Sequence, residues 1–149
     1  MVEFGIIVHF WPRKQWYNIL RLTDLNSIES DLNVTGDRIP AIFINTKAQT
    51  LYISNNVNET ADYVISIPIM LEQYYRIKIT QIEDGYGVNY TILINDEEVH
   101  TVINEGAKSF EEVVLFLSDT FYPSFVEFGS LYDLKIANIE SSGNNYNNQ

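Results

Sequence analysis

Apolar and polar residues alternate with a period of two through much of this chain. In residues 76–82, Ile77 and Ile79 stand between charged or polar neighbours, which is typical of a strand with one buried and one wet face. Residues 90–95 continue in the same style. The segment between them, 83–87, contains Asp-Gly and a second glycine, which favour a tight turn. The pattern therefore predicts a β-hairpin here.

Further short apolar segments are separated by polar turns, and no long helical period interrupts them. With a strand around Val99 and His100, they make about ten predicted strands, which favours an all-β fold. The fold class predicted is an antiparallel two-sheet β-sandwich of the jelly-roll, concanavalin-A-like kind, spanning residues 1–140, followed by a flexible polar tail at 141–149. The other predicted strands are 3–10, 16–22, 40–45, 50–54, 62–68, 74–82, 88–95, 111–119 and 128–139.

The charge balance bears on the choice of partner. Asp and Glu number 20 against 9 Lys and Arg, which gives a formal net charge of −11. Phosphate binding is driven by clustered basic residues, so this balance argues against nucleic acid and against anionic membranes. A solvated acidic surface is the ordinary explanation of such a charge.

Cysteine is absent, which removes disulfides, thiolate metal sites and a cysteine nucleophile from consideration. No apolar stretch approaches the roughly 18 residues of a membrane span. Met1 leads almost directly into the first predicted strand. We interpret this start either as a short cytosolic protein or, preferably, as a domain belonging to a longer multidomain chain.

Several motifs resemble those of a known superfamily. The hairpin formed by 73–79 and 90–99, the Gly-Asp-Arg-Ile-Pro segment at 36–40 and the corner from Ser118 to Ile136 resemble concanavalin-A-like, laminin-G-like jelly-roll domains. The resemblance covers most of the chain and implies the same sandwich fold, with a general role in adhesion or ligand recognition. It implies no particular site, because ligands in this superfamily bind at variable loops. The chain departs from the laminin-G pattern in having no C-terminal disulfide.

The resemblance also raises the question of calcium, which laminin-G-like domains commonly hold at a loop rim. Asp37 and Asp119 would be the candidate ligands, because Ca²⁺ prefers several hard oxygen donors on a loop. The alternative is that these carboxylates cap turns by accepting backbone N–H groups. The expected cofactor is therefore either none or one structural calcium ion.

Residues suited to catalysis do not fall into a recognisable motif. Sandwich glycosidases carry paired carboxylates in an E-x-D-x-x-E strand, whereas Glu29-Ser30-Asp31 lacks the third carboxylate. His9 and His100 are the two histidines, and a structural role is expected for each. A Ser-His-Asp set cannot be assembled from spacing, because its members converge only in the fold. We therefore predict that the chain is not an enzyme.

Aromatic residues near turns are the best candidates for ligand contact, although cross-strand pairing explains them equally well. These candidates are Trp11, Trp16, Phe121 and Tyr122. Asn-x-Thr sequons occur at Asn33, Asn58 and Asn89, and Asn58 is the expected glycosylation acceptor because it lies in a polar loop.

The preferred interpretation is a non-catalytic extracellular or cell-surface recognition module with a protein or glycan ligand. It would bind no nucleic acid and insert into no membrane. The alternative is a structural or assembly domain of a larger protein without an independent ligand. A carbohydrate-active enzyme is a third interpretation, which lacks its expected carboxylate pair.

Overall fold

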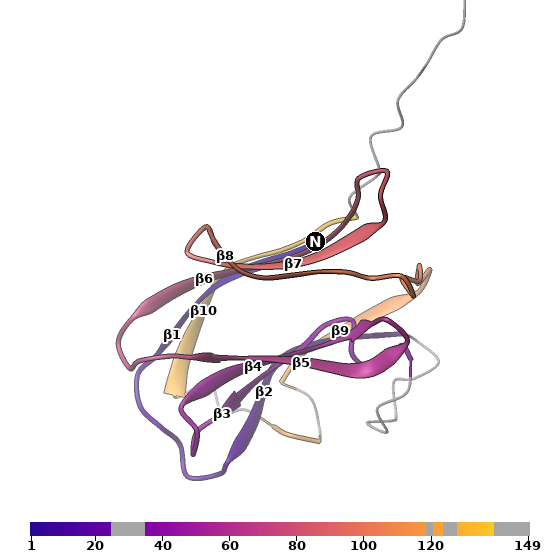
Figure 1. Ribbon diagram of the computed structural model, residues 1–149. Coiled ribbons are helices and arrows are strands. Elements are labelled where there is room, and N and C mark those ends of the chain that lie inside the picture. The colour runs from indigo at the N-terminus through magenta and orange to yellow at the C-terminus, as the bar shows by residue number, and fades with distance from the viewer. Residues whose placement is uncertain (25–34, 119–120, 124–127, 139–149) are drawn as a thin grey trace, which may run out of the picture.

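The computed structural model describes residues 1–24, 35–118, 121–123 and 128–138, which build two β-sheets lying face to face (Figure 1). The strands follow one another along the chain without an intervening α-helix in the described residues. They are β1 (Val2–Val8), β2 (Trp16–Asp24), β3 (Ala41–Asn45), β4 (Thr50–Val57), β5 (Thr60–Pro68), β6 (Tyr74–Glu83), β7 (Val88–Ile94), β8 (Glu97–Ile103), β9 (Val113–Leu117) and β10 (Gly129–Ile136).

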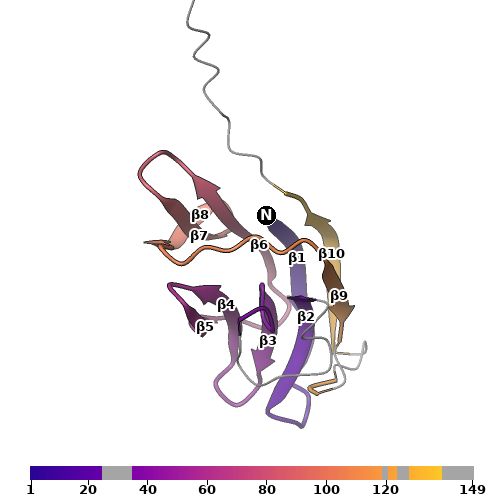
Figure 2. The same cartoon turned by 90° about the vertical axis from the view of Figure 1, so that its right-hand side faces the viewer.

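Each sheet has five strands, and every neighbouring pair is antiparallel. The first sheet has the order β10-β1-β6-β7-β8, and the second has the order β5-β4-β3-β2-β9. In Figure 2 the β7–β8 edge of the first sheet lies over the β4–β5 edge of the second. The predicted antiparallel two-sheet β-sandwich is therefore confirmed.

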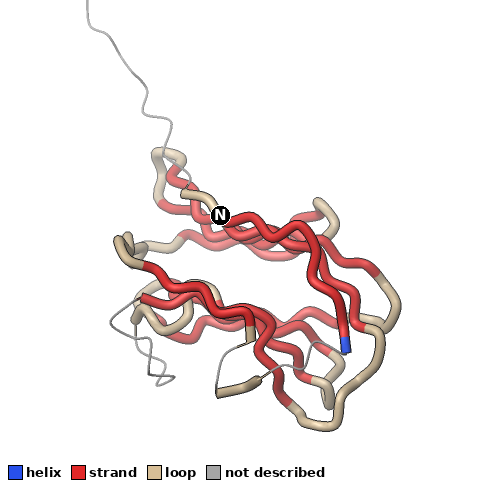
Figure 3. Tube along the Cα trace, turned by 180° about the vertical axis from the view of Figure 1, so that it is seen from behind, coloured by secondary structure: helices blue, strands red, loops and turns tan. Residues whose placement is uncertain are grey.

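Figure 3 shows the two layers from behind. The side chains of the core fill the space between them. Alternate residues of each strand point inward: Leu51 and Ile53 of β4 are fully buried, as are Ile77 of β6 and Ile92 of β7. Burying a side chain of this size contributes about 1.5–3 kcal/mol. The period-two pattern therefore fixes which residues of each strand face outward, where a ligand can reach them.

Two hairpin turns contain residues with left-handed backbone conformations. Asn95 and Asp96 have φ of 52° and 68° and join β7 to β8, as a two-residue turn with both central φ angles positive requires. Asn58 and Glu59 have φ of 50° and 61° and join β4 to β5 in the same way. The polar loop predicted around Asn58 is thus shorter than expected, because β4 extends to Val57.

β2 contains a bulge, and next to it the segment 121–123 is hydrogen-bonded to this strand. The pairing of β2 with β3 shifts between Asn18 and Leu20. The N–H of Asn18 donates to the carbonyl of Tyr122, at 2.7 Å. The short segment 121–123 is thereby attached to the outer side of the sheet.

The proposed division between a domain at 1–140 and a tail at 141–149 stays a prediction, because residues 139–149 lie outside those described. Within the described part of the chain, no helix has the length and apolar character needed to cross a membrane.

Candidate functional site

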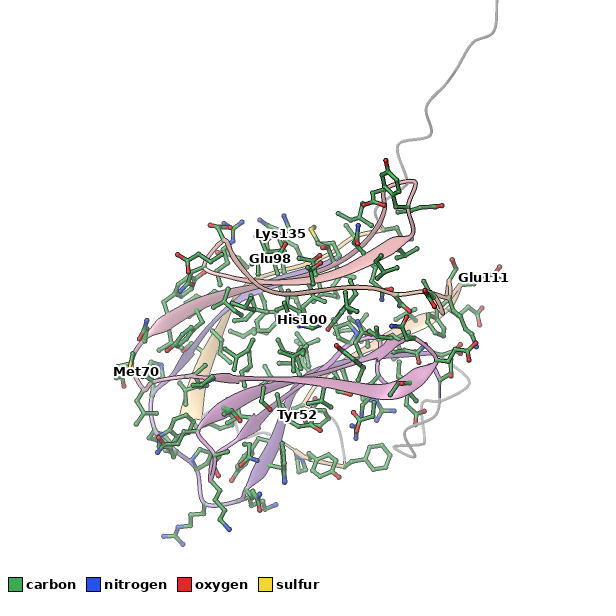
Figure 4. All side chains as sticks on the ribbon, viewed as in Figure 1. Tyr52, Met70, Glu98, His100, Glu111 and Lys135 are labelled. Atoms are coloured by element: carbon green, nitrogen blue, oxygen red, sulfur yellow. The ribbon has the colours of Figure 1, made fainter. Side chains whose placement is uncertain are left out.

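A hollow of about 190 Å³ lies on the outer face of the second sheet. Tyr52 stands between the inward-facing Leu51 and Ile53 of β4, so its ring projects away from the core. Figure 4 shows Tyr52 on that outer side of the sheet, whereas His100 lies between the two sheets. The residues lining the hollow are Trp16, Arg38, Phe43, Tyr52, Asp62 and Tyr122.

Four aromatic rings form the walls of this hollow. Phe43 and Tyr52 are directly paired across β3 and β4, with ring centroids 6.2 Å apart. Trp16 meets the Tyr52 ring edge-on at 5.0 Å, and Tyr122 meets Phe43 edge-on at 5.6 Å. Edge-on contacts of this kind hold rings in fixed orientations. Because Trp16, Tyr52 and Tyr122 stay partly exposed, they present apolar surface to a ligand.

An ion pair supplies the polar part of the site. Arg38 Nη1 donates to Asp62 Oδ1 at 2.8 Å, and the hydroxyl of Ser54 also donates to that oxygen. The Arg38 guanidinium lies over the ring of Phe43, 5.1 Å from its centroid. The side chain of Arg38 is 9% exposed and that of Asp62 is 26% exposed. The pair is therefore well shielded from water while the carboxylate still reaches the hollow.

The surroundings also hold the Tyr52 hydroxyl in its neutral form. Burial raises the pKa of Tyr52, the negative charge of Asp62 raises it further, and Arg38 opposes these effects. At neutral pH the hollow thus offers a phenolic O–H, a carboxylate and a guanidinium. This set can donate hydrogen bonds to a ligand and accept them from it.

The structure brings together two of the four aromatic candidates named from the sequence. Trp16 and Tyr122 line the hollow. Trp11 is partly buried and packs against the hydrophobic core instead. Phe121 is 41% exposed and lies beside the buried Arg21, whose guanidinium carbon is 5.3 Å from its ring centroid. Neither of these last two residues lines the hollow.

The candidate calcium ligands do not form a site in the described residues. Asp37 is 0% exposed, and its backbone carbonyl accepts a hydrogen bond from Arg21 Nε at 3.0 Å. Asp37 was expected at an exposed loop rim and is buried instead. Asp119 lies outside the described residues. In the described part of the chain, no three His, Cys, Asp or Glu residues come together in a way that could hold a metal ion.

The predicted glycosylation acceptor Asn58 is exposed, as expected, but it occupies a tight turn instead of a longer loop. Its side-chain oxygen accepts a hydrogen bond from the N–H of Glu105 at 2.7 Å. Glycosylation at Asn58 stays a prediction. His100 lies between the sheets, where its Nε2 is 3.2 Å from the hydroxyl of Tyr63.

Sequence reasoning missed Arg38, Asp62 and Ser54 as partners. Arg38 was noted within a fold motif, and Asp62 was placed at the start of a strand, but 24 residues separate them. Outward positions of adjacent strands could have linked Ser54 with Asp62, because β4 and β5 form a hairpin. Arg38 lies in the loop before β3, and no sequence pattern indicates that it pairs with Asp62.

Comparison with known proteins finds similarity among solved structures. No family model and no curated protein matches the chain. Among solved structures, the chain is similar to an endo-beta-1,4-glucuronan lyase from the fungus Trichoderma reesei, with 13% identity and a TM-score of 0.47. The match covers 89% of this chain and 55% of that one, so this chain spans about half of the length of that structure.

The interpretation as a non-catalytic extracellular recognition and adhesion module was wrong in what it drew from the fold alone, since a solved structure that is similar to the chain is an enzyme. That interpretation rested on a fold resemblance, and a shared fold does not determine function. At 13% identity and a TM-score of 0.47, the similarity carries no argument for lyase activity in this chain either. The prediction that the chain is not an enzyme stays untested.

Proposed function

We propose that this domain binds carbohydrate and that the hollow on the outer face of the second sheet is its saccharide site. The observation that carries the proposal is the Arg38–Asp62 ion pair inside aromatic walls. Sugar rings present apolar C–H faces and rims of hydroxyls. Aromatic rings stack against the faces, while a guanidinium and a carboxylate bind neighbouring hydroxyls as donor and acceptor.

The charges of the site favour a neutral sugar over a uronate. Arg38 is already neutralised by Asp62, so an incoming carboxylate would meet the negative charge of Asp62 without a dedicated cation. The net charge of −11 also repels a polyanion at a distance. Hydroxyl groups carry no such penalty.

The size of the hollow limits what it holds. Pockets for drug-sized molecules enclose roughly 300–1,000 Å³. A hollow of about 190 Å³ is smaller and suits one sugar ring, with the rest of an oligosaccharide lying along the exposed face. Trp16 and Tyr122 line the hollow and are partly exposed, so their rings can contact both the sugar in the hollow and the sugars outside it.

The test is a binding titration monitored by tryptophan fluorescence and by NMR, with neutral gluco-, xylo- and manno-oligosaccharides and with oligoglucuronate as the charged counterpart. Neutral oligosaccharides should bind, and Trp16→Ala should weaken the binding measured by NMR about tenfold. Tyr86→Ala is the matched control, because Tyr86 is 93% exposed on a distant hairpin. The same samples, assayed for new chain ends, report whether bound sugar is also cleaved.

The finer family assignment is a second, independent proposal. The β6–β7 hairpin and the position of β10 support a jelly roll of the concanavalin-A-like or laminin-G-like kind. One structural calcium ion, an extracellular location and a longer multidomain chain stay predictions. A melting curve that is unchanged by EDTA would remove the calcium ion from this proposal.

A further inference from the structure

His9, Glu72 and Ser130, which are far apart in the sequence, meet at the end of β1. The Nε2 atom of His9 is 3.2 Å from the hydroxyl oxygen of Ser130. Its Nδ1 atom is 3.0 Å from a carboxylate oxygen of Glu72. One ring nitrogen thus faces a hydroxyl while the other faces a carboxylate. This is the arrangement of a nucleophile, a general base and an orienting acid.

The backbone fixes all three residues around the same strand end. The N–H of His9 donates to the carbonyl of Phe128, which lies two residues before Ser130, at 2.8 Å. The N–H of Glu72 donates to the carbonyl of Val8, also at 2.8 Å. Glu72 has a φ of 60°, a conformation that a residue with a side chain adopts only at an energetic cost. The three side chains are therefore held by main-chain bonds on both sides of β1.

Close approach of β10 to β1 places Ser130 within reach of His9. Ser130 is paired with Ile7, and Gly129 is paired with Val8. A Cβ atom at Gly129 would stand 2.7 Å from the carbonyl oxygen of Ile7, so a glycine is needed there. This contact carries the next residue, Ser130, onto the outer face of the first sheet beside the histidine.

The cluster is open to solvent and has an aromatic neighbour. The side chain of His9 is 39% exposed and that of Glu72 is 66% exposed. Tyr132 lies two residues after Ser130 on the same face of β10, and its ring meets that of Tyr74 with centroids 6.0 Å apart. A substrate in front of the Ser130 hydroxyl would therefore have an apolar surface beside it.

We propose that Ser130, His9 and Glu72 form a catalytic triad for the hydrolysis of carboxylic esters. The Ser130 oxygen bonds to the carbonyl carbon while His9 Nε2 takes the hydroxyl proton. The carbon–oxygen bond of the ester then breaks, and His9 returns the proton to the departing alcohol. Water, deprotonated by His9 in the same way, attacks the acyl-serine and releases the carboxylic acid and the free hydroxyl. Glu72 is the positioning residue that orients His9.

This inference goes beyond the saccharide site, since the cluster lies on the opposite sheet and shares no residue with the hollow. The histidine was expected to be structural because its sequence neighbours offer no partners. The partners come instead from positions 63 and 121 residues away. Neither separation is visible in a local motif.

The test uses the full chain with p-nitrophenyl acetate and with a fluorophosphonate probe, whose phosphorus bonds to an activated serine as fluoride leaves. We expect saturable hydrolysis and a mass increase on the peptide containing Ser130. Ser130→Ala should abolish both, and His9→Gln should lower kcat at least 100-fold. Ser109→Ala and His100→Gln are the matched controls, and both should keep the activity.

Glu72→Gln should lower kcat about tenfold or more at unchanged KM, with partial recovery in Glu72→Asp, a pattern that mere loss of stability does not give. Circular dichroism melts establish that each variant is folded. The proposal is overturned if the folded wild-type chain shows neither labelling nor saturable hydrolysis. It is equally overturned if Ser130→Ala keeps the rate, because the histidine would then act without a serine nucleophile.

Discussion

Arg38 and Asp62, from a loop before β3 and from β5, form an ion pair of 2.8 Å whose aromatic surroundings shield it from bulk water. A shielded ion pair loses hydration when the chain folds, and the attraction between the two charges does not by itself offset this loss. Neighbouring groups that contact the charges are needed as well. Ser54 and the face of Phe43 provide these contacts here. The pair is thereby placed to contact the hydroxyl groups of a ligand.

Trp16→Ala removes the aromatic wall most suited to stacking. We expect saccharide affinity to fall about tenfold, since an aromatic contact of this kind is worth about 0.5–1.5 kcal/mol and tenfold in affinity is about 1.4 kcal/mol. Isothermal titration calorimetry measures the change. Equal loss in the control Tyr86→Ala would show that the effect is not specific to the hollow.

Asp62→Asn leaves the Arg38 guanidinium without its carboxylate in a shielded place. The free energy of unfolding should fall by about 1–3 kcal/mol, and saccharide binding should weaken with it. Arg38→Lys should keep the charge and much of the stability yet weaken binding, because an ammonium lacks the planar fork. Urea unfolding separates the two variants. Unchanged affinity in Arg38→Lys would exclude the guanidinium from recognition.

The Glu3 carboxyl in the first sheet makes the stability of the fold depend on pH. Its hydrogen bond to Arg76 lowers the pKa of the Glu3 carboxyl, with Lys135 and Lys78 adding to the effect against the opposing cost of burial. A carboxyl whose folded pKa is lowered stabilises the fold above its unfolded pKa of about 4.3, and this contribution is lost as pH falls through the folded value.

Glu3→Gln should therefore melt at a lower temperature than the wild type at pH 6–7, and the difference should shrink below about pH 4. Melting curves at a series of pH values provide the measurement. A difference that stays constant down to pH 3 would contradict the assigned role of the Glu3 charge.

The ring of Tyr74 lies over Gly5 on the first sheet, in space that is open because glycine has no side chain. A Cβ atom at position 5 would stand within 2.7 Å of three atoms of the Tyr74 side chain, so Gly5→Ala must displace Tyr74 from Tyr132. We expect a loss of about 1 kcal/mol. In a double-mutant cycle with Tyr74→Ala, most of that loss should disappear. Additive losses would mean that the ring and the glycine do not interact.

Asn104 joins the two sheets through its buried amide. Its Oδ1 accepts from the N–H of Asn58 at 2.8 Å, and its Nδ2 donates to Gln81 at 2.9 Å and to the carbonyl of Asn56 at 3.3 Å. Asn104→Ala should lower the free energy of unfolding by about 1–3 kcal/mol, because a turn N–H loses its acceptor. Thr101→Ala, at an exposed site on β8, is a control that should cost less.

The alternation of residues such as Ile77 and Ile79 predicted the strands because burial on one face of a sheet has the same period as the backbone. Asp84-Gly85 predicted a tight turn for the equally local reason that an Asp-Gly pair tolerates positive φ. The pairing of β1 with β6 and β10 lies beyond such signals, since these strands are far from β1 in the sequence.

The candidate sites depend on those long-range pairings. Trp16 and Tyr122 were singled out as aromatics near turns, yet what brings them together is the backbone hydrogen bond from Asn18 to Tyr122. Arg38 and Asp62 gave no reason to be paired. His9 gained its partners from a connection and from the last strand, so its surroundings exist only in the folded chain.

The most direct test of the saccharide proposal is a calorimetric titration of the wild-type chain and of Trp16→Ala with neutral oligosaccharides and oligoglucuronate. The structure predicts saturable binding of a neutral oligosaccharide by the wild type, about tenfold weaker binding by the variant and no comparable binding of the uronate. Absence of binding by a folded wild-type chain, or equal affinity in Trp16→Ala, would contradict the assignment of the hollow as a carbohydrate site.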